Sequence, residues 1–191
     1  MFKENIFFKS LLVCSFTLLL GCGNKSFSLD GFKSIKFDMS SSQLEGVGYK
    51  CSPDKKSCKK DSPRVDLKSE NETLFGQSTR LSVDLTDDKV SCIFVGVDIE
   101  DKELIELFEK ALGKPTTFQF NQIFTGNILQ KNFWVSSEET SITVTAVLNK
   151  QPPEGLFKML GPHSAAAYCN KQETSKLIVQ AKNAAIKPKD F

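Results

Sequence analysis

The sequence predicts an α+β fold with two layers, in which helices pack on one face of an antiparallel sheet that two disulfides reinforce. Several short segments alternate apolar and polar residues and are joined by short connections, which favours antiparallel strands. Two other segments carry apolar residues at helical spacing, and such a stripe needs a sheet face to cover it.

The first elements are expected after a short polar segment at residues 23–30. Phe32, Ile35 and Phe37 indicate a short strand. The following SSSQLEG, residues 40–46, offers serine caps, a glutamine and a closing glycine, which predicts a short helix. Residues 52–77 contain few apolar residues and many charges, so we expect a long loop there.

A β-hairpin is the clearest prediction. Leu81, Val83 and Leu85 alternate with polar residues, Asp87-Asp88 interrupts the pattern, and residues 90–99 resume it with more apolar side chains. Two alternating runs around a short polar break are typical of paired antiparallel strands.

A helix follows the hairpin, with Asp101 as its expected cap. Gly113 stands where a left-handed C-terminal residue is needed, and Pro115 prevents continuation. The apolar residues that share one face of this helix are Leu104, Ile105, Phe108, Ala111 and Leu112. Such a face predicts packing against the sheet.

Further strands are expected at residues 118–124, 128–135 and 141–148. After Pro152-Pro153 the pattern weakens into a less regular C-terminal extension. Residues 165–186 fit either a pair of strands or a strand and a helix.

The N-terminus predicts export and lipidation. Leu11–Leu20 is an apolar run of ten residues behind Lys3 and Lys9, too short to span a bilayer, which needs about 20. Its end, Leu19-Leu20-Gly21-Cys22, resembles the bacterial lipoprotein processing box, in which the cysteine receives acyl chains such as palmitate and becomes the first mature residue. A secreted soluble protein with a chance cysteine is the alternative.

The expected organisation is therefore a signal peptide at 1–21, a lipid-anchored tether at 22–30 and one α+β domain at 31–191. The residue after the lipidated cysteine is Gly23. Lipoproteins retained at the inner membrane often carry aspartate at this position, so glycine favours the outer membrane, facing the periplasm. Loss of the signal lowers the net charge from +2 to +1, so no bulk field favours nucleic acid.

Four cysteines remain for disulfides once Cys14 leaves with the signal and Cys22 carries the lipid. An even number in an exported chain predicts two bridges, and four cysteines allow three connectivities. We favour Cys51 with Cys58, across the turn-forming SPDKKS, and Cys92 with Cys169. A zinc site is disfavoured because the sequence holds one histidine, His163.

A family resemblance supports this view. IKFDMSSSQLEG resembles the Gly-Met-[Ser/Thr]-x-x-[Gln/Glu]-[Val/Leu] opening of small envelope lipoproteins, and FEKALGKPTTFQ, NFWV and SITVTAVLN resemble their later segments. The chain is thus similar to the small protein A (BamE-like) family, although Asp38 replaces the glycine before Met39. The resemblance implies an α+β scaffold and a partner in the envelope.

The sequence predicts a binding protein rather than an enzyme. It lacks a nucleophile elbow, a phosphate-binding glycine loop and a Cys-x-x-Cys pair, and His163 beside Pro162 is expected to be a loop residue. We expect no cofactor and no metal. Lysines that bracket Cys58 form a possible binding loop for anionic headgroups or an acidic protein: Lys55, Lys56, Lys59 and Lys60.

Aromatic residues cluster in the strands predicted after the helix, where core packing is favoured over a protein-binding patch: Phe118, Phe120, Phe124, Phe133 and Trp134. The expected function is non-catalytic binding or scaffolding of envelope components by a lipid-anchored protein. The alternative is a periplasmic inhibitor of a hydrolase such as lysozyme, since GVGYKC resembles the Tyr-x-Cys element of lipid-anchored inhibitors. A hydrolase is a third hypothesis.

Overall fold

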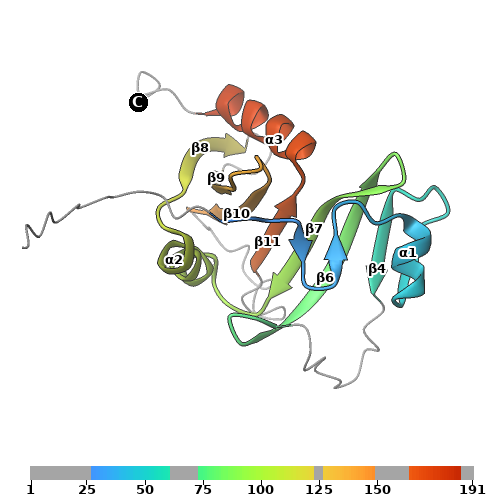
Figure 1. Ribbon diagram of the computed structural model, residues 1–191. Helices are drawn as coiled ribbons and strands as arrows, with labels where there is room; N and C mark the ends of the chain where they lie inside the picture. The colour runs from blue at the N-terminus through green and yellow to red at the C-terminus, as the bar shows by residue number, and fades with distance from the viewer. Residues whose placement is uncertain (1–26, 61–72, 123–126, 149–163, 186–191) are drawn as a thin grey trace, which may run out of the picture.

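A computed structural model describes residues 27–60, 73–122, 127–148 and 164–185 (Figure 1). The helices are α1 (Ser41–Gly46), α2 (Asp101–Leu112) and α3 (Lys171–Ala184). The first strands are β1 (Gly31–Phe32), β2 (Ile35–Lys36), β3 (Tyr49–Cys51), β4 (Ser57–Lys60), β5 (Thr73–Leu74) and β6 (Gln77–Thr86). The later strands are β7 (Lys89–Val97), β8 (Thr116–Gln122), β9 (Asn127–Val135), β10 (Ser141–Val147) and β11 (Ser164–Cys169).

The main sheet has the strand order β3-β4-β6-β7-β11-β10-β9-β8, and every neighbouring pair in it is antiparallel. The short β5 pairs with β6, while β1 and β2 form a separate ribbon. After β7 the chain passes through α2 to the far edge at β8, and the later strands return until β11 pairs with β7. The α+β class and the antiparallel sheet are therefore confirmed.

Local turn chemistry explains the hairpin between β6 and β7. Asp87 and Asp88 both adopt positive φ angles, 52° and 57°, as the two central residues of a tight hairpin turn that matches strand twist. The predicted hairpin is confirmed. The predicted helix at 40–46 is also present as α1, where Ser40 and Gln43 form a reciprocal capping box.

The second helix begins differently from the prediction. Its N-cap is Glu100, which makes no side-chain capping bond, whereas Asp101 is the first helical residue. The Asp101 carboxylate instead accepts a hydrogen bond from the Ser164 hydroxyl, at 2.7 Å. Gly113 ends the helix with a φ of 89°, as expected, and its carbonyl accepts a hydrogen bond from the Trp134 indole at 2.8 Å.

The prediction that the helices pack on one face of the sheet is not confirmed. Phe108 of α2 packs its ring 5.2 Å from that of Trp134, which lies opposite Ile142 of β10. The Thr174 hydroxyl of α3 is 2.8 Å from that of Ser141, the residue next to Ile142. Because successive strand residues point to opposite faces, α2 covers one face and α3 the other. Figure 1 shows β8, β9 and β10 between these two helices.

We call the face under α2 the inner face and the face under α3 the outer face. The inner face holds most of the core, including the fully buried Val83, Ile93 and Val144. The β1–β2 ribbon also covers this face, since the Phe32 ring lies 4.9 Å from the ring of Tyr168 in β11. The burial of that phenol raises the pKa of Tyr168 far above its ordinary value.

Both predicted disulfides are confirmed, Cys51–Cys58 and Cys92–Cys169. Each joins residues directly opposite each other in neighbouring antiparallel strands, β3 with β4 and β7 with β11. The C-terminal region forms a strand and a helix, β11 and α3, which decides between the two possibilities left open by the pattern.

Candidate binding surface and chain entry

The predicted basic loop is a β-hairpin of the main sheet. The sequence assigned residues 52–77 to one long loop, but β3 and β4 continue the sheet beside β6, and Cys58 is fully buried. That part of the prediction is wrong, because charged residues on the solvent face hid a strand whose other face is in the core. Residues 61–72 lie outside the described residues.

The turn of this hairpin is built from short side chains. The Ser52 hydroxyl donates to Asp54 at 2.6 Å, and the Lys56 amide donates to the same carboxylate oxygen at 3.2 Å. Lys55 adopts a φ of 53°, and its amide donates to the Ser52 carbonyl at 2.8 Å. The hydroxyl bond from Ser52, followed by the Lys56 amide, lowers the pKa of Asp54. The turn therefore holds its carboxylate ionised at neutral pH.

The disulfide sets the positions of the lysines. Because Cys51 pairs with Cys58, Lys50 lies directly opposite Lys59, and both side chains are exposed on the outer face. Sequence reasoning missed Lys50, although the cysteine pairing alone gives this register. Lysines placed opposite each other repel unless neighbouring groups compensate their charge.

The four predicted lysines are thus only partly brought together. Lys59 lies on the strand with Lys50, whereas Lys55 and Lys56 are exposed in the turn. The side chain of Lys60 is outside the described residues. We name the set of Lys50, Lys55, Lys56 and Lys59 the basic hairpin.

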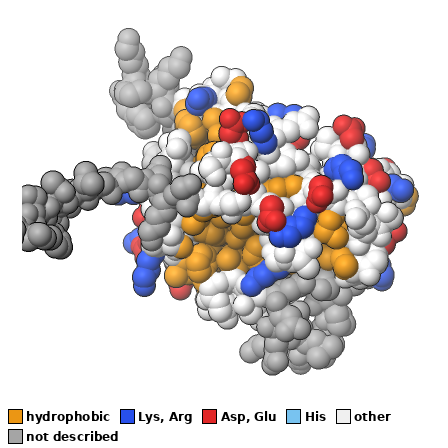
Figure 2. All heavy atoms as spheres, in the orientation of Figure 1, with side chains coloured by type: hydrophobic (Ala, Val, Ile, Leu, Met, Phe, Trp, Pro, Cys, Tyr) orange, Lys and Arg blue, Asp and Glu red, His pale blue; other side chains and the backbone are white. Residues whose placement is uncertain are grey.

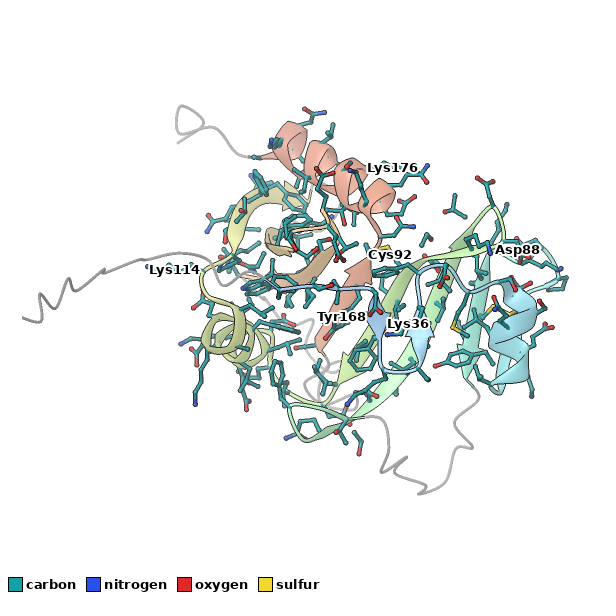
Figure 3. All side chains as sticks on the ribbon, in the orientation of Figure 1. Lys36, Asp88, Cys92, Lys114, Tyr168 and Lys176 are labelled. Carbon is teal, nitrogen blue, oxygen red and sulfur yellow. A yellow bond between two sulfur atoms is a disulfide. The ribbon has the colours of Figure 1, made fainter. Side chains whose placement is uncertain are left out.

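An acidic corner adjoins this hairpin. Asp88 accepts a hydrogen bond from the Ser41 amide at 3.2 Å, at the start of α1 (Figure 3). Hydrogen bonds from Ser41 lower the pKa of Asp88, with a smaller contribution from the positive charges of Lys55 and Lys89. The positive charge of the basic hairpin is therefore partly balanced on its α1 side.

The chain enters the fold at the turn between β9 and β10. The Phe27 carbonyl accepts hydrogen bonds from the backbone amide and hydroxyl of Ser137, at 3.3 and 3.4 Å. Ser28 donates to Glu138 at 2.9 Å, and the Leu29 carbonyl accepts from Thr140 at 2.9 Å. Residues 27–30, which the sequence analysis assigned to the tether, are therefore packed on the domain.

An apolar area lies beside this entry point. Figure 2 shows hydrophobic side chains gathered on one face between α2 and β1. Phe27 and two residues of α2, Leu107 and Leu112, are partly buried apolar side chains that pack against the core. Lys114, just after α2, lies near the same side of the molecule (Figure 3).

The predicted aromatic cluster divides between the two faces. Trp134 is buried on the inner face and Phe133 on the outer face, with 3% and 1% of their surfaces exposed. Phe118 and Phe120 of β8 are half-buried. Core packing therefore accounts for the two residues of β9, while β8 keeps some aromatic surface at the sheet edge.

Other predicted site residues lie outside the described part of the chain, namely Cys22, Phe124 and His163. Within the described ranges, no group of three or more His, Cys, Asp or Glu side chains is arranged to hold a metal ion. No helix among the described residues is long and apolar enough to cross a membrane.

Comparison with known proteins identifies no relative: no family model, no curated protein and no solved structure matches the chain.

Proposed function

We propose that this protein is a lipid-anchored envelope protein that acts by binding other envelope components. The observation that carries the proposal is the Leu19-Leu20-Gly21-Cys22 box, followed after four residues by a chain already packed on the domain at Phe27. The two disulfides support an exported, oxidising location. The similarity to small protein A lipoproteins supports the same assignment and stays part of this proposal.

The short distance between anchor and fold restricts where the domain can act. Five residue steps from Cys22 to Phe27 span at most about 18 Å when fully extended. A compact domain of the size of the described part is expected to have a radius of gyration of about 14 Å. The lipid anchor therefore keeps the entry side of the domain, with the β9–β10 turn and the nearby apolar area, close to the bilayer.

Cys22→Ser is expected to release the protein from the membrane, because the acyl chains would no longer be attached. Fractionation of cells followed by mass spectrometry of the mature N-terminal peptide measures this. Cys14→Ser is the matched control, since Cys14 lies in the apolar run and its replacement should leave the membrane fraction unchanged. Unmodified Cys22 in the native protein would contradict the lipoprotein assignment.

Replacement of Lys50 and Lys59 by glutamine is expected to weaken binding to envelope partners without unfolding the domain. Both side chains are exposed, and exposed charges usually change stability by no more than about 0.5 kcal/mol. The effect should be larger at low salt, because the attraction between charged groups is then screened less by ions. The measurement is the amount of envelope protein captured with the lipidated protein from solubilised envelopes, at low and high salt.

Lys102→Gln with Lys110→Gln is the matched control, because it removes the same charge from the exposed side of α2. Equal losses for the two double variants would mean that net charge, and not the basic hairpin, determines capture. The same capture separates the alternative function: retention of added lysozyme, with no endogenous membrane protein, would favour a periplasmic inhibitor.

A further inference from the structure

Strand β8 forms an unusual edge of the main sheet. It pairs with β9 over seven residues, Thr116↔Phe133 through Gln122↔Asn127, and no described strand pairs with its other side. The opposite edge, β3, is three residues long and carries Lys50. Charged residues and short length protect natural edges from pairing with other chains. The edge at β3 has these devices, whereas residues 116–122, TTFQFNQ, contain no charge and no proline.

The side chains of β8 contact those of β9 on both faces of the sheet. On the inner face, Thr117 donates to Asn132 at 3.0 Å and Gln119 donates to Gln130 at 3.3 Å. On the outer face, the Phe118 ring meets the ring of Phe133 edge-on, with centroids 5.9 Å apart. A strand already ordered on both faces loses little conformational entropy when another strand pairs with it.

We propose that a second copy of this chain pairs with β8 in antiparallel fashion, about a two-fold axis at Gln119, so that one sheet runs through both subunits. Gln119 is the central residue of β8, so the two-fold places it opposite the partner's Gln119. Phe118 then lies opposite the partner's Phe120 on the outer face, and Thr117 opposite the partner's Asn121 on the inner face.

The sequence of β8 is complementary to itself in this register. Each cross-strand position joins aromatic with aromatic or neutral polar with neutral polar, and such pairs stabilise antiparallel strands. A charged residue near the axis would meet its own copy and repel it, and β8 has none. A two-fold contact also closes on itself, unlike a head-to-tail contact that would continue into a filament. These properties favour a second copy over a different extended peptide, and they do not depend on the lipid anchor.

Cysteine cross-linking of the full-length protein in its native membranes tests the register. Gln119→Cys should give a covalent homodimer with a short bifunctional thiol reagent, because the two thiols meet at the axis. The protein's own bridges, between directly opposed residues with Cα atoms 4.0 and 4.2 Å apart, illustrate how close such positions lie. Thr117→Cys alone and Asn121→Cys alone should not cross-link, since each thiol lies about 13 Å along the strand from its copy. Co-expression of these two variants should restore the cross-link.

The Gln119→Lys variant tests the same contact by disrupting it. Two lysines at the axis repel, so sedimentation of the detergent-solubilised protein should change from dimer to monomer, with circular dichroism and the melting temperature retained because Gln119 is exposed. Val179→Cys, on α3 and 56% exposed, controls for random collision.

Several results would overturn the proposal. These are a monomeric wild-type protein, equal cross-linking of Val179→Cys and Gln119→Cys, or a Gln119→Cys adduct with a different protein. None of these results bears on the lipid-anchored function, which the Cys22→Ser variant tests separately.

Discussion

Replacement of both Cys92 and Cys169 by alanine is expected to lower the free energy of unfolding by about 4–5 kcal/mol. The bridge joins residues 77 apart in sequence, so it removes much more conformational freedom from the unfolded chain than a short-range bridge does. Both cysteines are buried, with 7% and 0% of their surfaces exposed, and alanine also leaves unfilled volume there. A loss of this size is a large part of the stability of an ordinary domain.

The Cys51→Ala, Cys58→Ala protein is the matched control, since it removes a bridge with a separation of seven residues. The chain-entropy relation gives about 2.5 kcal/mol for this loop. Urea unfolding of the two double variants and the wild type, followed by circular dichroism, measures the ranking. If the Cys51–Cys58 variant were the less stable of the two, long-range loop closure would not be the source of the stabilisation.

Elements governed by local chemistry were predictable from the sequence. The capping box of Ser40 and Gln43, the tight turn at Asp87-Asp88 and the left-handed Gly113 each depend on residues close together in the chain. The alternating patterns of β6 and β7 were equally clear, because one face of each strand is in the core. The Cys51–Cys58 pairing was predictable because a short turn joins the two residues.

The layers and the binding surface depended on long-range information. The helical stripe of α2 showed that this helix needs a sheet face, but nothing in the sequence showed that the C-terminal segment would form a helix on the opposite face. Phe133 and Trp134, adjacent in β9, carried a usable signal: two large apolar neighbours in a strand indicate burial on both sides. The basic hairpin was mistaken for a loop because its lysines are exposed, on the outer face or in the turn. Lys50 was missed because its position opposite Lys59 follows only from the strand pairing.

Phe133→Ala is expected to destabilise the protein by about 3–5 kcal/mol, the usual cost of truncating a fully buried aromatic side chain. Phe133 is 1% exposed on the outer face, beside Thr143 of β10 and in contact with Phe118. On a two-layer fold that face would be open to water, and the same substitution would cost little. The loss of unfolding free energy therefore shows whether α3 covers a second buried layer. Urea unfolding, followed by the fluorescence of Trp134, measures it.

Val135→Ala is the matched control, because Val135 lies two residues further along the same strand and face but is 41% exposed. Its truncation should change the free energy of unfolding by less than about 1 kcal/mol.

Thr174→Val tests the packing of the helix itself. The Thr174 hydroxyl pairs with that of Ser141 and donates to the Cys169 carbonyl at 3.2 Å, so its loss leaves buried polar groups unpaired and should weaken the packing of α3 on the sheet. A small effect of Phe133→Ala, similar to that of Val135→Ala, would show that α3 does not stay on the outer face in solution.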